Sequence, residues 1–377
     1  MRIGRRGGLA GVIALLLAPA TVQGQTPPQL WVLSVGARQG WFNDVLVPDV
    51  TTNATAVSNL GLSLAYTRNS TLSQFAATGA GAATFYRNSP GGNRLNYSGS
   101  LLWNRRLSSR TKIYVQDELV SAFSQTTPFL ASGGLYFPYT QTLTNRALVG
   151  LERQFTPRDL LSGELRHDWV NFTSSTLTGG QQLNASLSYR RVLGAQQSVG
   201  LSYAHLWSDV REGVTVTDSL HATWTRNFSL RTNVAASLGA SYFRSAALAG
   251  QLRATGSLTA NHQREKTAFQ LQYSRSIDQA WGFGRMRIAD TVKVALSRPI
   301  GRRFDGRVTG GYGRSRDPGD PLFAYDVLFA DAGLSFRPVP ALTLAASYGI
   351  ARLVLVTSPE RITHAVDLSI AYAWRWR

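Results

Sequence analysis

Six charged residues in the middle of the chain have types and a spacing that could act on a charged solute. They lie on one phase of three successive stretches in which every second residue is polar: Arg146, Glu152, Glu164, Arg166, Asp168 and Arg190. Acids and bases that face each other across water create a transverse field that orients and filters solutes. The same charges could instead pair along one wall and satisfy a buried polar face. The sequence leaves both interpretations open.

A second charged set, later in the chain, is mostly basic. Asp305 shares its polar phase with four basic residues, Arg285, Arg287, Lys293 and Arg307, and the whole chain carries a formal net charge of +18. Most of the basic residues are arginines, which bind phosphate and carboxylate through two parallel hydrogen bonds. The expected partners are therefore outer-membrane lipid, lipopolysaccharide phosphates, and small anionic solutes or a polysaccharide. Nucleic acid is not expected, because the arginines are dispersed along the sequence instead of forming one basic motif.

Catalytic chemistry has weak support in the sequence. His221 shares a phase with Ser219 and Thr223, but residues two apart on one strand are too distant for a base to contact its nucleophile directly. The segment "GGYGRSRDPGD" lacks the order of glycine, lysine and hydroxyl that holds a phosphate. There is no cysteine, and no cluster has metal-ligand spacing. We therefore predict no enzyme, no cofactor and no metal site.

The elements that position these charges are strands, because apolar and polar residues alternate with period two from residue 30 to residue 376. Eighteen such stretches can be marked, and short connections alternate with mostly longer ones. That rhythm is typical of transmembrane barrels, in which periplasmic turns are short and extracellular loops are long. The sequence predicts an all-β, antiparallel up-and-down transmembrane barrel of about 18 strands, or 16 if the first stretch lies outside the wall. Both termini of the barrel chain then lie on the periplasmic side.

The first 24 residues read as a signal peptide that is removed on export. "MRIGRR" is a charged start, and the apolar segment after it is too short to span a bilayer. Small residues suited to peptidase cleavage follow at Ala18, Ala20 and Gly24. Residues 1-24 are thus the expected signal peptide and residues 25-377 the barrel.

Aromatic residues recur at one end of successive strand pairs. Seven of them share the outward phase at the short-turn end and are expected to form a girdle at the membrane interface: Tyr66, Trp103, Phe155, Tyr189, Trp224, Phe336 and Trp374. A second girdle on the other rim would contain Trp169, Trp207, Tyr242, Trp281 and Tyr325. Two carboxylates, Asp218 and Asp290, also fall in the outward phase. A β-bulge is the preferred explanation and an oligomer contact the second.

The end of the chain, "AVDLSIAYAWRWR", carries a family resemblance. It resembles the C-terminal targeting strand of bacterial outer-membrane β-barrel proteins, in which outward apolar and aromatic residues end in a terminal aromatic. The resemblance implies recognition by the barrel-assembly machinery through Tyr372, Trp374 and Trp376, although Arg377 follows the terminal aromatic position. At the level of pattern the chain is also similar to barrel porins of exopolysaccharide loci.

A barrel of this size leaves an aqueous lumen. The sequence therefore predicts an outer-membrane channel for passive diffusion of small hydrophilic, anionic solutes. The alternatives are a barrel for exopolysaccharide secretion and a non-conducting barrel for scaffolding or adhesion. The uncharged aromatic segment 125-140 would either fold inward as a constriction or remain an exposed cap or protomer contact.

Overall fold

The computed structural model describes residues 29–43, 55–87, 93–123, 141–173, 177–210, 213–245, 249–281, 285–320, 324–355 and 358–376. The predicted signal peptide and the segment 125-140 lie outside these ranges. Eighteen strands account for almost all of the described residues: β1 (Gln29–Asn43), β2 (Thr55–Asn69), β3 (Ser73–Arg87), β4 (Arg94–Ser108), β5 (Thr111–Phe123), β6 (Gln141–Thr156), β7 (Asp159–Phe172), β8 (Gly180–Gly194), β9 (Gln197–Val210), β10 (Gly213–Ser229), β11 (Thr232–Ser245), β12 (Gln251–Arg264), β13 (Thr267–Ala280), β14 (Arg285–Ile300), β15 (Phe304–Arg316), β16 (Ala324–Val339), β17 (Leu342–Leu355) and β18 (Ser358–Trp376).

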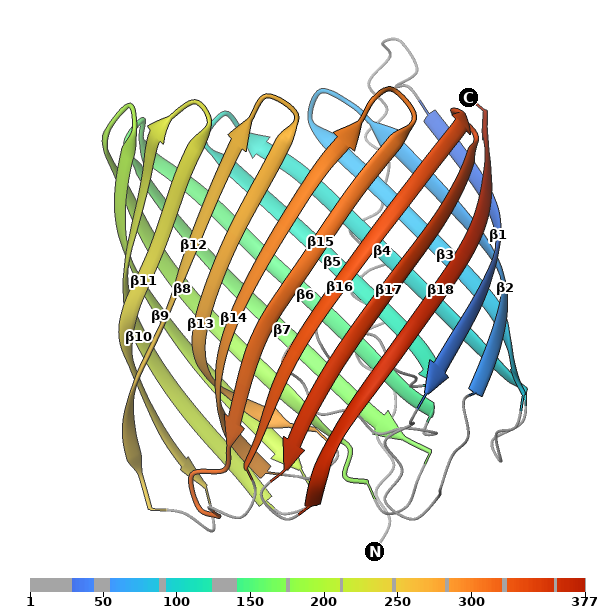
Figure 1. The fold of residues 1–377 in the computed structure, drawn as a ribbon. Coiled ribbons are helices and arrows are strands. Elements are labelled where there is room, and N and C mark those ends of the chain that lie inside the picture. Colours follow the sequence, from blue (N-terminus) through green and yellow to red (C-terminus); the bar gives the residue numbers. More distant parts are fainter. Residues whose placement is uncertain are drawn as a thin grey trace, which may run out of the picture.

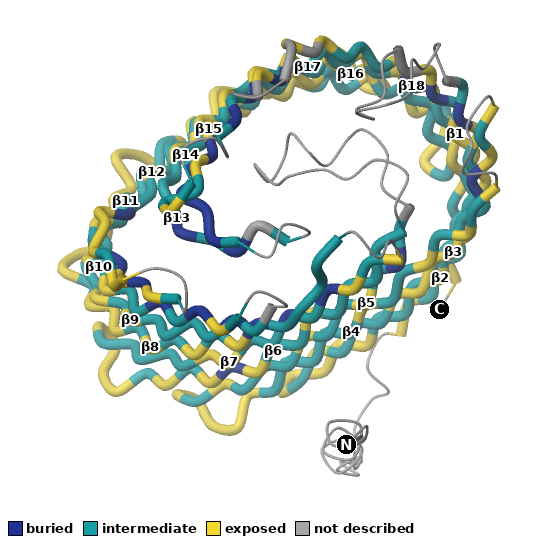
Figure 2. Tube along the Cα trace, turned by 90° about the horizontal axis from the view of Figure 1, so that it is seen from below, coloured by how far each residue is buried: buried dark blue, intermediate teal, exposed yellow. Residues whose placement is uncertain are grey.

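Every strand pairs antiparallel with its neighbours in sequence, and the sheet closes on itself. β1 pairs with both β2 and β18, so that Trp31 lies opposite Trp376 at the seam. The strands are tilted and form a closed ring when seen end-on (Figures 1 and 2). Closure leaves no strand edge with unpaired backbone groups, which a bilayer would not tolerate. The predicted fold class and the count of 18 strands are confirmed, and the first stretch belongs to the wall.

The two faces of the wall differ as the alternation predicts. Leu60, Leu62 and Leu64 on β2 are among many large apolar side chains that are exposed on one face, with Leu60 57% exposed. The opposite face of β2 carries Asn59, Gly61 and Ser63. A soluble protein rarely exposes so much contiguous apolar surface. The apolar face is therefore the outer, lipid-contacting one, and the polar face lines the interior.

The two rims also differ. One rim carries eight connections of two or three residues, such as 109–110 and 157–158, and it is also the rim where β1 begins and β18 ends. At seven of these turns, a backbone carbonyl accepts a hydrogen bond from the N–H of an adjacent strand, as Arg110 does from Gln154 at 2.8 Å. The described residues give no such bond to turn 265–266. There the register would place Pro299, which has no N–H to donate.

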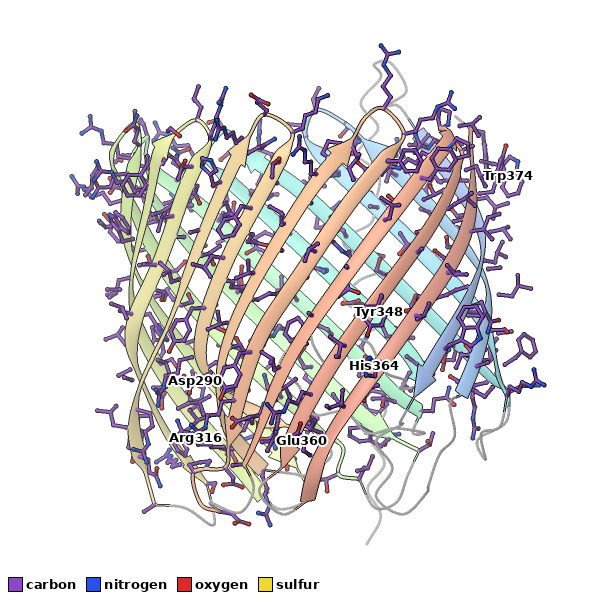
Figure 3. All side chains as sticks on the ribbon, viewed as in Figure 1. Asp290, Arg316, Tyr348, Glu360, His364 and Trp374 are labelled. Carbon is purple, nitrogen blue, oxygen red and sulfur yellow. The ribbon has the colours of Figure 1, made fainter. Side chains whose placement is uncertain are left out.

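Both outward carboxylates lie in unbroken register, so the β-bulge interpretation is wrong. Asp218 pairs in continuous sequence with β9 and β11, and Asp290 does so with β13 and β15. Asp290 forms ion pairs with Arg275 at 3.7 Å and with Arg316 at 3.6 Å. His205 Nδ1 lies 2.8 Å from the carboxylate of Asp218. Figure 3 places Asp290 and Arg316 near the long-loop rim, far from Trp374 at the short-turn rim. Partners on neighbouring strands thus compensate both carboxylates.

The described part of the chain contains no helix that is long and apolar enough to cross a membrane.

Candidate functional site

All ten residues predicted to line a pore occupy the inward register of the wall. They are Arg146, Glu152, Glu164, Arg166, Asp168, Arg190, Arg285, Arg287, Lys293 and Arg307. In the described residues, further basic side chains share this register: Arg38, Arg94, Arg106, Lys112, Arg253, Arg337 and Arg375. The additional acidic residues of the inward register are fewer: Glu118, Asp278, Asp305, Asp331 and Asp367. The described inward face therefore has a basic excess.

A buried carboxylate organises the charged wall that β6 and β7 form. Asp168 is 8% exposed and accepts an ion pair from Arg146 Nε at 2.7 Å and another from Arg166 Nε at 2.9 Å. Arg146 lies directly opposite Asp168 in the register, and Arg166 is two residues before it on β7. Both arginines stay partly exposed to the interior. At this level of the wall the charges pair with one another and leave one positive charge in excess.

Tyr114, which the sequence did not single out, holds another charge of the same wall. Its hydroxyl donates a hydrogen bond to Glu164, two strands away. The register places Gly150 between them, opposite both residues. A β-carbon on Gly150 would overlap the Tyr114 ring, so the absence of a side chain lets the ring cross β6. An inward glycine between a tyrosine and a carboxylate is the signal that could have predicted this contact.

A side chain at position 150 should therefore break the hydrogen bond between Tyr114 and Glu164. We expect Gly150→Ala to lower the free energy of unfolding by about 1 kcal/mol, because Tyr114 must swing away from a charged acceptor that is partly exposed. Urea titration of the refolded barrel in lipid would measure this change. Tyr114→Phe should cost about the same, and the double variant little more than either. Gly163→Ala is the matched control on β7, where the nearest atom to a new β-carbon is 3.8 Å away. Additive losses in the double variant would contradict the shared contact.

The wall across the barrel, from β14 to β18 and β1, carries ion pairs and an isolated lysine. Arg307 lies 3.4 Å from Asp331, and Arg38 on β1 pairs with Asp367 on β18 at 2.7 Å. Lys293 has no ion pair with any described residue. Figure 1 places β5 to β7 behind β14 to β18, on opposite sides of the interior. A solute in the interior would thus pass between an internally paired wall and a wall with an uncompensated lysine.

The long-loop end of the hairpin β13–β14 bends into the interior. Figure 2 shows this end inside the ring of strands and coloured as buried. Ile277, Met286 and Ile288 are each less than 9% exposed and form a cluster with Phe243, which is fully buried and faces inward from β11. Ile277 and Ile288 continue the lipid-facing register of their strands. Because the hairpin turns inward, that register meets the inner wall instead of lipid.

Two of the predicted pore residues anchor this hairpin. Arg285 Nη1 lies 2.8 Å from Asp320 and 3.6 Å from Asp317, both in the connection after β15. Arg287 is 8% exposed, and its Nη1 donates a hydrogen bond to the Tyr325 hydroxyl at 2.9 Å. Both arginines are therefore committed to protein partners. The hairpin they hold narrows the interior at the long-loop rim.

The inner face of β10 to β12 is uncharged and joined by hydroxyl groups. His221 Nε2 lies 2.8 Å from Thr255 Oγ1, Thr255 lies 2.9 Å from Ser241, and Ser241 lies 2.8 Å from Ser219. No carboxylate takes part in this chain of hydrogen bonds. Among the described residues, no three of the types His, Cys, Asp or Glu come together in a way that could hold a metal ion. The network is a polar lining with no orienting acid for the imidazole.

The seven residues of the predicted aromatic girdle all occupy the outward register at the short-turn rim. Several have aromatic neighbours at the same depth: Tyr66 lies 4.5 Å from Trp31, and Phe336 lies 4.5 Å from Phe304, between ring centroids. Tyr372, Trp374 and Trp376 project outward from β18. The prediction of a second girdle was wrong for one residue. Tyr325 faces inward and is 4% exposed, because Arg287 bonds to it from the inward-bent hairpin.

No protein-family model matches the chain, and no curated protein matches it by sequence. Solved structures share its fold. OccAB4 of Acinetobacter baumannii matches with a TM-score of 0.50 and 10% identity, over 93% of this chain and 99% of that chain. OpdL of Pseudomonas aeruginosa matches with a TM-score of 0.50 and 11% identity, over 93% and 99%. The outer membrane protein OpdK of the same species matches with a TM-score of 0.50 and 11% identity, over 92% and 99%. The chain therefore has the fold of a porin-like, bacterial outer-membrane β-barrel.

Proposed function

We propose that the protein is an outer-membrane channel through which small hydrophilic solutes diffuse passively, with a preference for anions. The closed 18-strand wall with a polar, partly charged inner face is the observation that carries this function. Barrels of 16 to 18 strands leave room for water, whereas side chains can fill an eight-stranded one. The outward apolar face and the likeness in fold to an outer membrane protein support the location.

The anion preference rests on the basic excess of the inward face and on its arrangement. Acidic residues of this face have basic neighbours, as Asp168, Asp331 and Asp367 do. Lys293 has no acidic partner among the described residues, and its neighbours in the register are the uncharged Gln272 and Gly311. A water-filled interior with net positive walls lowers the energy of an anion and raises that of a cation.

Assembly is a separate proposal that uses the last strand. We propose that Tyr372, Trp374 and Trp376 on the outer face of β18 are recognised by the barrel-assembly machinery. Their outward register on the strand that closes the barrel against β1 supports this proposal, because outward side chains are accessible to a partner at the membrane.

Single-channel recording of the refolded protein in a planar bilayer tests the channel function. We expect stable open steps and, under a salt gradient, a reversal potential that indicates preferential passage of anions. Circular dichroism and insertion into vesicles would establish that the preparation is folded. A folded, inserted barrel that remains silent would contradict the channel function, and a cation-selective one would contradict the anion preference alone.

A further inference from the structure

Outward-facing arginines recur on alternate strands at the short-turn rim. One lies near the end of each even-numbered strand from β2 to β14, on the lipid-facing register: Arg68, Arg105, Arg153, Arg191, Arg226, Arg264 and Arg298. We call this set the arginine arc. All of these side chains are exposed except Arg105, which is half-buried. Alternate strands are about 10 Å apart, so the arc spreads positive charge along most of one rim.

The arc has almost no acidic compensation. Of its seven members, only Arg191 has an ion pair in the described part of the chain, with Asp159 at 3.8 Å. Arg153 and Arg226 lie over the rings of Phe155 and Phe228, at 5.4 and 4.9 Å from the ring centroids. These contacts orient the guanidinium groups without neutralising them.

At the opposite rim, several outward charges of β13 to β18 pair with one another, although Arg87 and Arg244 have no ion pair among the described residues. There Arg314 lies 3.5 Å from Asp326, and Arg352 lies 2.7 Å from Glu360, in addition to the two ion pairs of Asp290. Those charges neutralise one another within the wall. Apart from the ion pair of Arg191, the arc has no acidic partner in the described part of the chain. Its positive charge can be neutralised by an anionic group outside the protein.

The depth of the arc matches lipid headgroups. Arg68, Arg105 and Arg191 each follow an aromatic girdle residue by two positions. Two residues of a strand span about 7 Å, so these side chains extend from the girdle toward the rim. Girdle aromatics lie at the membrane interface, and long basic side chains reach the headgroup region next to it. Short turns mark the periplasmic side, so the nearest headgroups are those of the periplasmic leaflet.

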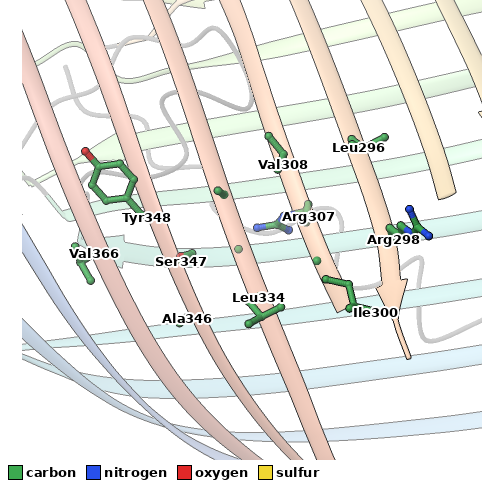
Figure 4. Close-up of a pocket in the computed structure, with 13 residues that line it drawn as sticks. Leu296, Arg298, Ile300, Arg307, Val308, Leu334, Ala346, Ser347, Tyr348 and Val366 are labelled. Carbon is green, nitrogen blue, oxygen red and sulfur yellow. The ribbon is translucent and has the colours of Figure 1, made fainter. Parts of the chain in front are cut away.

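A groove on the outer wall begins beside Arg298. It has a cavity volume of about 610 Å³ and crosses β14 to β18 (Figure 4). Gly306, Ala332 and Ala346 leave space on its floor, and Leu296, Ile300, Val308, Leu334, Tyr348 and Val366 line it. Gly306 lies directly opposite Arg298 in the register. The groove is an apolar surface that could hold a lipid acyl chain, and it lies next to the guanidinium group of Arg298.

We propose that the arginine arc binds the phosphate groups of anionic phospholipids in the periplasmic leaflet, and that the groove at Arg298 holds an acyl chain of one such lipid. This proposal depends on insertion in the outer membrane but not on conduction. A barrel that conducts nothing would still bind lipid, and a conducting barrel without headgroup preference would refute only this proposal.

Lipid retention by the full-length refolded barrel tests the proposal. The barrel would be extracted from bilayers with equal amounts of phosphatidylglycerol and phosphatidylcholine, and the retained lipids counted by native mass spectrometry. We expect phosphatidylglycerol to dominate. The triple variant Arg68→Gln, Arg264→Gln and Arg298→Gln should reduce the phosphatidylglycerol preference by at least about tenfold, because each removed charge weakens attraction to an anionic surface. Addition of salt should reduce the wild-type preference in the same direction.

The matched control removes three exposed arginines of the same rim that face inward: Arg106→Gln, Arg337→Gln and Arg375→Gln. It should keep the wild-type preference, and an equal loss would show that only net charge matters and would refute the arc. Arg298→Gln and Ala332→Leu provide single changes that leave most of the wall intact. Each should remove the most tightly held lipid, and retention of that lipid in both would refute the groove. Preferential retention of lipid A over phosphatidylglycerol, when both are offered, would contradict the proposal that the arc binds phospholipids of the periplasmic leaflet.

Discussion

Removing the inward-bent end of the hairpin β13–β14 should raise the single-channel conductance at least about twofold. The change replaces residues 279–286 by Asn-Gly, a two-residue turn that suits a hairpin, and so joins Asp278 to Arg287. These two residues already lie opposite each other in the register. The described residues of the deleted part, 279–281 and 285–286, project inside the ring of strands. Conductance rises with the area of the narrowest section of a water-filled pore. The variant also exposes Phe243 to the interior, since it removes Met286 from the buried cluster.

Shortening another connection of the same rim provides the control. The connection β11–β12 joins strands that stay in the wall. Replacing residues 244–250 by Asn-Gly joins Phe243 to Gln251, which lie opposite each other in the register, and should leave the conductance unchanged. A milder variant, Phe243→Ala, keeps the hairpin but removes the inward side chain against which Ile277 and Ile288 pack. It should increase the frequency of current fluctuations without a large change in the main conductance level. Unchanged conductance after the deletion would mean that the hairpin does not set the narrowest section.

The alternation of side chains predicted the wall well, because the physical constraint acts residue by residue. Each strand must present apolar groups to lipid and polar groups to the interior, so the phase of Leu60 or Arg146 can be read from its immediate neighbours. Closure also requires that the ends of the chain meet. The pairing of Trp31 with Trp376 is consistent with that requirement, although the sequence did not predict this register.

The features that the sequence did not predict depend on distances across strands or on bends of the wall. Ile277 and Ile288 keep perfect lipid-facing phase, yet their hairpin leaves the wall and buries them. Asp290 breaks the phase in sequence, and only the register brings Arg275 and Arg316 within reach to compensate it. The arginine arc escaped notice because its members are far apart along the chain. They appear dispersed in sequence and become one set only when the barrel closes.

Changing the charge of the inner wall at Lys293 and Arg307 should change the ion preference of the channel. The variant Lys293→Glu with Arg307→Gln removes three units of positive charge. At about 10 Å in water, a unit charge changes the energy of a passing ion by about 0.4 kcal/mol, so three units amount to about 1 kcal/mol. The same charges act on anions and cations with opposite sign, so the ratio of anion to cation permeability changes by about 2 kcal/mol, or about thirtyfold, before screening by salt reduces it. The reversal potential under a salt gradient measures this ratio directly.

Position, and not net charge, should determine the outcome. Arg298→Glu with Arg302→Gln makes the same change in net charge but acts on the outer face and on a turn, so it should leave the reversal potential near that of the wild type. The buried carboxylate gives the opposite test. Asp168→Asn removes the acidic partner of Arg146 and Arg166, and should strengthen the anion preference if the paired wall acts on solutes. A loss of stability with an unchanged reversal potential would show that the ion pairs of this wall only hold neighbouring strands together. In that case the inward basic residues outside these ion pairs, such as Lys293 and Arg190, would be the main source of ion preference.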